Sequence, residues 1–300
     1  MRWVRRSAAS KAIVLVTGET GTGKELVARA IHDLGPDRDQ PFMAVNLAAI
    51  PHGMVESELF GHERGAFTGA DRRREGILRA AGSGTVFLDE VADMPASAQA
   101  KLLRALEARE VQPLGSDGAA PFGARIVVAT HRDLPQRVAE GSFRADLYYR
   151  LNVLRIHMPP LRERPEDIPA LVHHLLARHS TRCGVPLPQM SASALRALCQ
   201  HPWRGNVREL SNVLQRALIL AEGGHIGLEQ IPSDVREAAP AGGLALRGAI
   251  DRSERAHIAL VLRLCGGHRE RTAAELGISP ATLYRRLERL RLKGEARSFA

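Results

Sequence analysis

Cysteine, aromatic residues and long apolar runs are all scarce in this sequence. The three cysteines, Cys183, Cys199 and Cys265, lie far apart and are odd in number, which excludes a disulfide scaffold and favours a reducing compartment. Aromatic residues make up only 4% of the chain. No uncharged apolar run approaches the roughly 20 residues that a membrane-spanning helix requires. The composition is therefore that of an ordinary globular protein, and we expect no membrane partner.

The first residues imitate a secretion signal only superficially. A basic cluster of Arg2, Arg5 and Arg6 is followed by a short apolar run at 12–16. A glycine-rich loop then stands where a cleavage site would be required. We therefore expect no export and a cytoplasmic location.

Positive charge is in excess and is concentrated near the C-terminus. The formal net charge is +9, and residues 251–300 carry eleven Lys or Arg against six Asp or Glu. An uneven basic excess is typical of a protein that meets a polyanion, most simply nucleic acid. Charge alone does not separate this interpretation from a solvated basic tail.

Short apolar runs alternate with helical patterns in the first half of the chain. The runs are at 12–17, 42–45, 85–88 and 125–129. Buried strands that alternate with helices predict an α/β fold with a parallel sheet and crossover connections.

Helical periodicity alone continues from about 165 to 231, followed by a stretch rich in Ala, Gly and Pro and then by further helical patterns. We therefore predict four segments: an α/β nucleotide-binding part at 1–161, a helical lid at 162–232, a linker at 233–248 and a small all-helical domain at 249–300.

The most informative loop follows the first predicted strand and matches the pattern G-x-x-x-x-G-K. Glycines allow backbone N–H groups to surround phosphate oxygens, the following helix N-terminus adds a favourable dipole, and the lysine reaches the outer phosphates. The loop predicts a site for ATP. Its residues, with the first one of the helix, are Gly18, Glu19, Thr20, Gly21, Thr22, Gly23, Lys24 and Glu25.

Two carboxylates follow the third apolar run. Asp89 and Glu90 come at the carboxyl end of the predicted strand 85–88, which is where α/β sheets bind ligands. We expect Asp89 to hold Mg²⁺ and Glu90 to orient and polarise the water that attacks the γ-phosphate. The usual Mg²⁺-binding hydroxyl is missing after Lys24, because Glu25 occupies that position.

The segment between these two motifs carries the hexapeptide Gly65-Ala66-Phe67-Thr68-Gly69-Ala70. With the phosphate loop and the acidic pair, it makes the chain resemble the NtrC-like AAA+ bacterial enhancer-binding proteins, which activate sigma-54 RNA polymerase. The resemblance extends over about residues 11–293. In that family the hexapeptide is a surface loop that contacts the sigma factor and moves with the nucleotide state. Small residues and glycines around Phe67 suit a bending loop that presents one apolar anchor.

The resemblance also implies roles for residues outside these motifs. Asn46 resembles the residue that restrains the catalytic glutamate. Arg144 and Arg150 resemble arginines that reach the nucleotide of a neighbouring subunit, where such a finger accelerates phosphoryl transfer by ~10³–10⁵. Arg208 resembles the lid arginine that points at the phosphates of its own chain. By resemblance, the ATPase units form a ring, expected to be a hexamer.

The chain departs from the family pattern at two informative places. His131 follows the fourth strand where asparagine is usual, and we expect it to contact phosphate or water. Only a short segment precedes the phosphate loop, so no receiver or ligand-sensing domain is present among these residues. We therefore expect control by another protein or by the level of expression.

The C-terminal segment reads as a helix, a tight turn and a second helix. Gly277 suits the end of one helix, and Ser279 with Pro280 suits the start of the next. This pattern resembles the Fis-type helix-turn-helix, whose second helix enters the major groove of double-stranded DNA as part of a dimer. Our candidate base or phosphate contacts are Thr282, Arg285 and Arg286.

These observations predict a sigma-54-dependent transcription activator that uses ATP and Mg²⁺. Two alternatives stay open at this stage. One is a DNA-binding regulator with an impaired ATPase, and the other is an AAA+ replication initiator or helicase loader, against which the hexapeptide argues.

Overall fold

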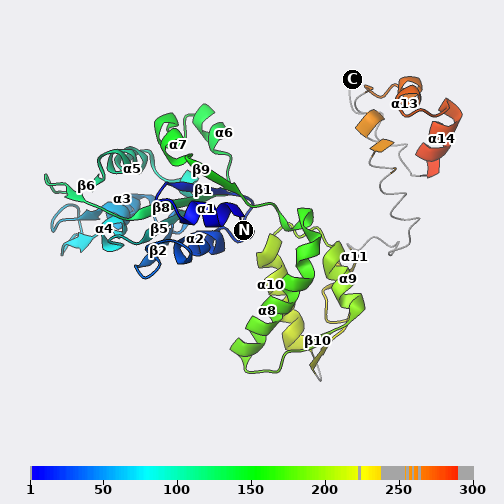
Figure 1. Ribbon diagram of the computed structural model, residues 1–300, viewed down its shortest axis with the longest axis horizontal. Coiled ribbons are helices and arrows are strands. Elements are labelled where there is room, and N and C mark those ends of the chain that lie inside the picture. Colours follow the sequence, from blue (N-terminus) through cyan, green and yellow to red (C-terminus); the bar gives the residue numbers. More distant parts are fainter. Residues whose placement is uncertain are drawn as a thin grey trace. The chain divides into compact units, whose positions relative to one another are not determined.

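The computed structural model describes residues 2–221, 224–237, 254, 257–258, 260–262 and 265–289 (Figure 1). The chain divides into two compact units, Met1–Ala238 and Ala239–Ala300. The first contains a parallel sheet and a helical lid, and the second contains a small group of helices.

The sheet has five parallel strands in the order β2-β5-β8-β1-β9. Their bounds are β1 Val14–Thr17, β2 Phe42–Asn46, β5 Thr85–Asp89, β8 Arg125–Thr130 and β9 Leu154–His157. The predicted α/β class is confirmed, and each of the four predicted runs contains a strand. The edge strand β9 was not anticipated, because only alternate residues of it are partly buried and its apolar signal is weak.

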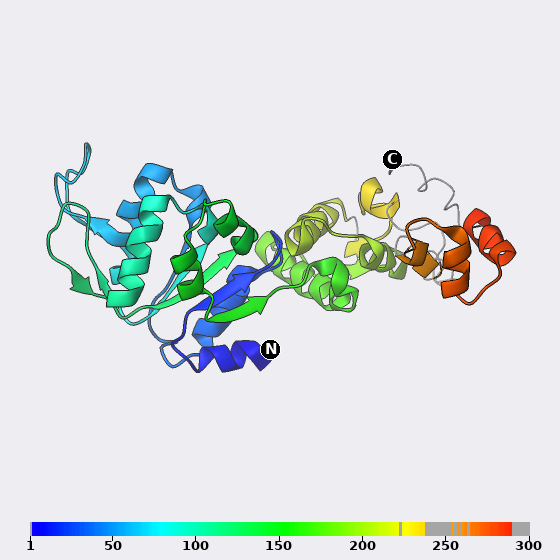
Figure 2. The same cartoon turned by 90° about the horizontal axis from the view of Figure 1, so that it is seen from above.

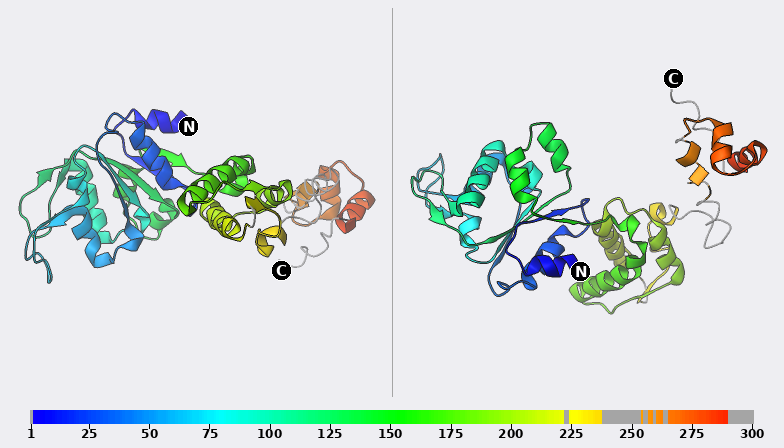
Figure 3. Two further views of the ribbon diagram at one scale, coloured as in Figure 1. Left: turned by 90° about the horizontal axis from the view of Figure 1, so that it is seen from below. Right: turned by 45° about the horizontal axis from the view of Figure 1, so that its top comes forward.

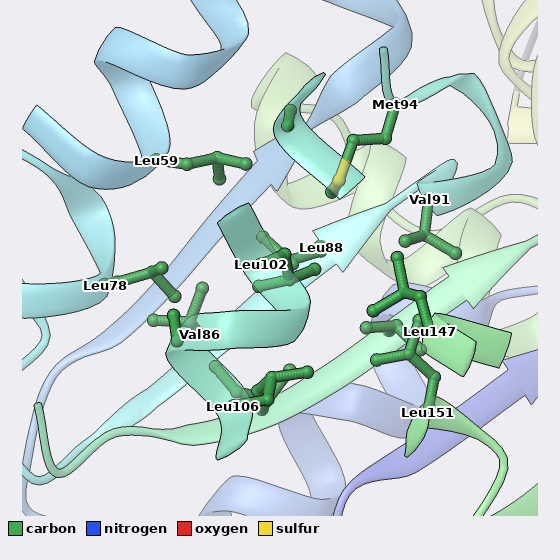
Figure 4. Close-up of a cluster of buried hydrophobic side chains, with 14 of the residues drawn as sticks. Leu59, Leu78, Val86, Leu88, Val91, Met94, Leu102, Leu106, Leu147 and Leu151 are labelled. Carbon is green, nitrogen blue, oxygen red and sulfur yellow. The ribbon is translucent and has the colours of Figure 1, made fainter. Parts of the chain in front are cut away.

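The buried strands alternate their side chains between two cores, as the pleat of a strand requires. Leu15, Val86 and Leu88 face the larger core, together with helix residues such as Leu59 and Leu102 (Figure 4). Other strand residues face a smaller core on the opposite side: Val14, Val16, Phe87, Val127 and Ala129. The sheet is thus covered on both faces, which explains its near-continuous apolar strands.

Helices supply the two outer layers around the sheet (Figures 1 and 2). The larger core is covered by α3 His52–Phe60, α4 Ile77–Ala80, α5 Ala96–Ala108, α6 Leu134–Ala139 and α7 Ala145–Leu151. The smaller core is covered by α1 Arg2–Ala8 and α2 Lys24–Asp33, which lie side by side (Figure 3). Two short antiparallel pairs complete this part: β3 Gly61–His62 with β4 Arg74–Glu75, and β6 Glu110–Val111 with β7 Ala120–Pro121.

The first helix is fixed to the sheet through a buried arginine. The guanidinium of Arg125 on β8 donates to the carbonyl oxygens of Ser7 at 2.5 Å and Ala8 at 3.1 Å. A cation at the C-terminal end of a helix is favoured by the helix dipole. Burial lowers the pKa of Arg125.

The lid is a helical bundle of α8 Ile168–Cys183, α9 Ala192–Gln200, α10 Asn206–Leu220 and α11 Ser233–Glu237, with a small parallel pair, β10 Gln189–Met190 and β11 His225–Ile226. Its core includes the fully buried Trp203, whose indole N–H donates to the carbonyl of Leu198 at 2.8 Å. Among the described residues, no helix has the length and apolar character to cross a bilayer.

The predicted linker, 233–248, begins too early. Residues 233–237 form α11, and Val235 is buried in the lid core. A single apolar residue on a short helix gives too weak a periodic signal to stand out in an Ala-, Gly- and Pro-rich stretch. Residues 238–248 lie outside the described part of the chain.

In the second unit, α13 Arg269–Glu275 and α14 Pro280–Arg289 pack around Ile258, Ala273, Leu283 and Leu287. The predicted turn is confirmed: Gly277 has a φ of 65°, and Ile278 N donates to the carbonyl of Ala273 across the helix end. The second helix begins at Pro280, as predicted, and is described as far as Arg289.

Candidate functional site

The phosphate loop lies at the carboxyl end of the sheet, between β1 and the first residue of α2. Gly21 and Gly23 have φ angles of 79° and 98°, which side-chain-bearing residues rarely adopt. Gly21 also approaches the lid so closely that a Cβ there would lie 2.4 Å from the carbonyl oxygen of Gly205. The glycines are therefore required by backbone conformation and by contact with the lid.

Lys24 opens α2 and is 6% exposed. Its ammonium group donates to the carbonyl oxygens of Gly18 at 3.0 Å and Glu19 at 3.3 Å. It also lies 3.9 Å from Oε1 of Glu90. The loop is thus closed around a cation that faces the acidic pair, which is the charge arrangement that a phosphate site needs.

The acidic pair lies at the carboxyl end of β5, as predicted: Asp89 is the last residue of the strand and Glu90 follows it. Burial raises the pKa of Asp89, and the adjacent Glu90 charge raises it further. Glu90 adopts a left-handed conformation with φ 56° and ψ 47°, and its N–H donates to Oδ1 of Asp89 at 3.1 Å. A non-glycine residue in this region of φ/ψ space is strained, and such strain is concentrated at functional sites.

The structure brings His131, and not Asn46, to Glu90. Nδ1 of His131 lies 2.7 Å from Oε2 of Glu90, and the backbone N–H of His131 donates to the same oxygen at 3.2 Å. Asn46 pairs with Asp89 in the sheet, but its side chain is exposed and accepts from Ala48 N at 3.0 Å. The expected contact between Asn46 and the glutamate is therefore absent from this structure.

Glu19 joins the phosphate loop to the lid. Its carboxylate receives a two-pronged pair from Arg162, with distances of 2.7 and 2.8 Å, and a hydrogen bond from Asn206 at 3.1 Å. These hydrogen bonds, that of Arg162 first, lower the pKa of Glu19 to about 2. A planar guanidinium matches a carboxylate in this geometry.

Asn206 is the centre of this connection. It is fully buried and left-handed, with φ 55°. Its amide donates to the carboxylate of Glu19 and to the carbonyl of Thr20 at 3.0 Å, and its carbonyl accepts from Leu161 N at 2.7 Å. One side chain therefore ties the phosphate loop to both the start and the last long helix of the lid.

Two further hydrogen bonds extend the same connection. The backbone N–H of Val207 donates to the carbonyl of Gly21 at 3.0 Å, and Arg164 donates to the carbonyl of Thr22 at 3.2 Å. We call these lid contacts to residues 19–22 the lid clasp, formed by Arg162, Arg164, Asn206 and Val207.

Arg208 stands next to this clasp, on the first turn of α10. A Cβ at Gly21 would lie 3.1 Å from its Cβ, so its backbone adjoins the phosphate loop. With Thr20 and Arg216 it lines a cavity of about 450 Å³. The role of Arg208 in phosphate binding stays a prediction.

Among the described residues, neither Arg144 nor Arg150 forms a hydrogen bond or an ion pair with the phosphate loop. Arg144 forms an exposed pair with Asp146 at 2.7 Å, and Arg150 donates to the carbonyl of Leu106 at 3.0 Å. Arg144 precedes the first residue of α7, and Arg150 lies on that helix. Two large side chains nearby are also exposed: Tyr149 on α7 and Val153 just after it. The arginines are thus placed on a surface rather than in their own nucleotide site.

The hexapeptide forms a loop between β3 and β4. Gly65 and Gly69 have φ angles of 81° and 96°, and a Cβ added at either would meet no atom within 4 Å. Phe67 is 42% exposed, and its ring meets the ring of His62 edge-on, with a centroid distance of 4.9 Å. His62 is buried and lies 2.7 Å from the hydroxyl of Ser57. The aromatic tip therefore rests on a fixed ring at the base of the loop.

A second hairpin supports this loop from the side. Leu114, between β6 and β7, donates to the carbonyl of Gly61 and accepts from Glu63 N, both at 2.9 Å. Gly115 lies against Ala66, where an added Cβ would come within 2.9 Å of the alanine methyl. Movement of residues 110–121 would therefore be transmitted to the hexapeptide.

The candidate DNA contacts all lie on α14 in the second unit. Arg285 is exposed, whereas Arg286 pairs with Glu254 at 2.6 Å. The hydroxyl of Thr282 lies 2.8 Å from that of Ser279, whose side chain also accepts from Thr282 N at the start of the helix. Of these three side chains, only that of Arg285 forms no hydrogen bond or ion pair with another described residue.

Comparison with known families decides what this combination is. The description "Sigma-54 interaction domain" matches residues 1–157, "AAA+ ATPase lid domain" matches 162–245, and "Bacterial regulatory protein, Fis family" matches 249–290. The chain belongs to the family of sigma-54 interaction domains. The predicted resemblance is therefore confirmed, along with its AAA+ lid and Fis-type helix-turn-helix.

Relatives of this sigma-54 family member include regulators of transcription. The regulatory protein AtoC of Escherichia coli (strain K12) is 44% identical over 94% of this chain and 63% of its own length. The transcriptional regulatory protein ZraR of Klebsiella oxytoca is 44% identical over 94% of this chain and 64% of its own length. The chain thus spans less than two thirds of the length of these relatives.

Solved structures of another protein share the fold of this chain. NtrX from Brucella abortus in complex with ADP has a TM-score of 0.75 at 33% identity, over 96% of this chain and 67% of that one. The same protein in complex with ATP has a TM-score of 0.71 at 34% identity, over 96% of this chain and 66% of that one.

The lid clasp was not predicted from the sequence. Arg162, Arg164 and Asn206 lie in segments that were matched to the lid, but without a role. Each bonds to the phosphate loop across more than a hundred residues of chain. The one available signal was an asparagine between Gly205 and a helical pattern, which also suits an ordinary helix start.

Proposed function

We propose that this protein activates transcription by sigma-54 RNA polymerase through ATP hydrolysis in the bacterial cytoplasm. One observation carries the proposal: a phosphate loop with Lys24 facing Glu90, and the hexapeptide at 65–70, occur in the same α/β unit. The nucleotide site supplies energy, and the loop supplies a surface that contacts the sigma factor.

Within the nucleotide site, each side chain has a separate task. The N–H groups of residues 18–24 and the ammonium of Lys24 bind the phosphates, and Arg208 approaches them from the lid. Glu90 orients the attacking water with its carboxylate. Asn46 pairs with Asp89 in the sheet, and we propose that it restrains Glu90 in another nucleotide state.

The residues around Asp89 fit Mg²⁺. No cluster of three or more His, Cys, Asp or Glu in the described ranges is arranged to hold a metal ion by itself. Mg²⁺ is usually held by one or two carboxylates together with substrate phosphates, and a cation would relieve the repulsion that Asp89 experiences from Glu90 and Glu25. When bound, the ion neutralises phosphate charge in the transition state.

Hydrolysis is proposed to require neighbouring subunits. Arg144 and Arg150 are directed to the surface around α7 and not to their own phosphate loop, which suits arginines that act on the next subunit of a ring. We propose a hexameric ring for the ATPase part. The second unit binds an upstream site on double-stranded DNA as a dimer, with Thr282, Arg285 and Arg286 on the helix that enters the major groove.

In this scheme, nucleotide-dependent movement of the 110–121 hairpin is transmitted to the 65–70 loop through Leu114 and Gly115. The loop then pushes on the sigma factor and remodels the closed promoter complex into the open one. Phe67 is the apolar anchor of that contact.

The test is the ATPase rate of the full chain as a function of protein concentration. Active sites that need a neighbour give a rate per subunit that rises with concentration until the ring is assembled. The Glu90→Gln variant provides the background, because an amide does not accept the proton of the water. A wild-type rate equal to this background at every concentration would remove the proposal and favour a DNA-binding regulator with a dead ATPase.

A further inference from the structure

The two carboxylate oxygens of Glu90 have different surroundings. Its side chain is 12% exposed, so water does not compete strongly for these contacts. Oε2 receives His131, through Nδ1 at 2.7 Å and through the backbone N–H at 3.2 Å. Oε1 faces the ammonium of Lys24 at 3.9 Å. The two oxygens therefore have different surroundings, one fixed by His131 and one directed to the phosphate loop.

The segment that carries His131 is itself anchored next to Glu90. The side chain of Thr130 accepts from Arg132 N at 3.0 Å and shapes the turn after β8. The guanidinium of Arg132 pairs with Asp93 at 2.8 Å, and Asp93 lies in the single turn of helix that follows Glu90. The turn at 130–132 and the turn at 90–93 are thus joined on either side of the contact between His131 and the glutamate.

We propose that His131 is a positioning residue for Glu90. It binds Oε2 with two donors and leaves Oε1 directed at the phosphate cradle, where that oxygen receives the proton of the attacking water. This inference rests on the proposed ATPase and assigns to His131 a role other than contact with phosphate. A carboxylate acceptor at Nδ1 also fixes the proton of the imidazole on that nitrogen.

The geometry predicts that asparagine could replace histidine at position 131. In both side chains the nitrogen in question is bonded to Cγ, so it lies the same number of bonds from the backbone. Nδ2 of an asparagine can therefore occupy the position of Nδ1 and donate to the same oxygen. Glutamine carries its amide one carbon further out and does not place a donor there without displacing the glutamate.

The test compares His131→Asn, His131→Gln and His131→Ala in the full chain at concentrations that saturate assembly. We measure kcat and KM for ATP, and the dissociation constant of a fluorescent ATP analogue. We expect kcat to fall at least about tenfold for the alanine and glutamine variants, with KM and analogue affinity changed by less than about twofold. The asparagine variant should retain at least about half of the wild-type kcat.

His174→Ala, at an exposed histidine on α8, is the matched control and should match the wild type.

Several outcomes overturn the inference. If the alanine variant keeps its kcat, His131 does not position the glutamate. If the analogue affinity falls while kcat is kept, His131 acts on the nucleotide itself. If the asparagine variant is as slow as the glutamine variant, reach to Oε2 is not what matters; this pair decides the question even if the alanine variant does not fold. Failure of the proposed function is separate, because then wild type and Glu90→Gln show the same rate.

Discussion

The phosphate loop and the 65–70 loop are both glycine-rich, yet the structure treats them in opposite ways. Residues 19–22 are each bonded to the lid clasp, and a Cβ at Gly21 would collide with the lid backbone. A Cβ added at Gly65 or Gly69 would meet no atom within 4 Å, and Phe67 at the tip of their loop is 42% exposed. Glycine therefore allows close contact with the lid in the phosphate loop, whereas in the 65–70 loop it allows an unusual backbone conformation without close neighbours.

This difference follows from what each loop is proposed to do. A catalytic site depends on donors and acceptors held in place by a supporting layer of bonds. A segment that moves must be drawn from the less stable part of a structure, with few buried contacts. The lid clasp and the contact between Phe67 and His62 mark these two extremes within one unit.

The largest effect is expected from Lys24→Ala. Removal of the cation from the phosphate loop should lower ATP hydrolysis by more than about 100-fold, because the outer phosphates lose their direct charge partner. DNA binding, measured by a gel-shift titration, should stay unchanged because α14 lies in the other unit. Lys11→Ala, at a lysine paired with Asp37 on the surface, is the control. Loss of DNA binding with Lys24→Ala alone would show that the two units are not separable in this way.

Phe67→Ala should separate the two loops most clearly. Open-complex formation by sigma-54 polymerase should fall at least about 50-fold, because an anchoring aromatic side chain dominates a small contact. The ATPase rate should stay within about twofold of the wild type. Val185→Ala, which removes an apolar side chain of the same 42% exposure from the lid, should change neither. Abolished hydrolysis with intact sigma-factor binding would contradict the assigned role of the loop.

Asn206→Ala tests the rigid side of the comparison. The substitution leaves the buried N–H of Leu161 without its acceptor, a loss that costs about 1–3 kcal/mol, and it also removes one hydrogen bond from the carbonyl of the exposed Thr20. The free energy of unfolding, from urea titration of the full chain, should fall by at least that amount. Gln215→Ala, on the exposed face of the same helix, should have little effect. Equal stability of the two variants would mean that the clasp does not hold the lid.

The smallest effect concerns Glu19, whose carboxylate binds the lid clasp. The pKa of Glu19 is lowered from 4.5 to about 2 in the folded state, so its contribution to stability is present above pH 4.5 and is lost as the pH falls toward 2. Glu19→Gln lacks this ionisation. The stability difference between wild type and this variant should therefore shrink as the pH falls from 5 to 3, followed by circular dichroism. A difference that is constant over this range would show that the carboxylate charge is not what the lid binds.

Sequence patterns were sufficient where local chemistry determines the structure. The phosphate loop, the acidic pair at the end of β5 and the turn at Gly277 were located because their residue types satisfy conformational rules over a few positions. The contacts between distant segments were not accessible in this way. Nothing in the local sequence indicates that Asn206 meets Glu19, or that His131 reaches Glu90 while Asn46 bonds to its own turn.

Some elements were missed for a different reason, which is weak amphipathicity. The edge strand β9 buries only alternate residues in part, and α11 contributes a single buried valine to the lid. Arg286 was selected as a basic residue on an exposed helix, but its pairing with Glu254 depends on how the helices of the second unit pack. The pattern of charges along α14 does not contain that information.

The most direct test of the central claim is capture of the sigma factor by the full chain in the presence of ADP and aluminium fluoride, which imitates the transferring phosphoryl group. We expect a stable complex that sediments as a ring with bound sigma-54, and no such complex with ADP alone or with Phe67→Ala. A ring that binds ADP and aluminium fluoride but not sigma-54, or one that binds sigma-54 equally well without nucleotide, would contradict the central claim.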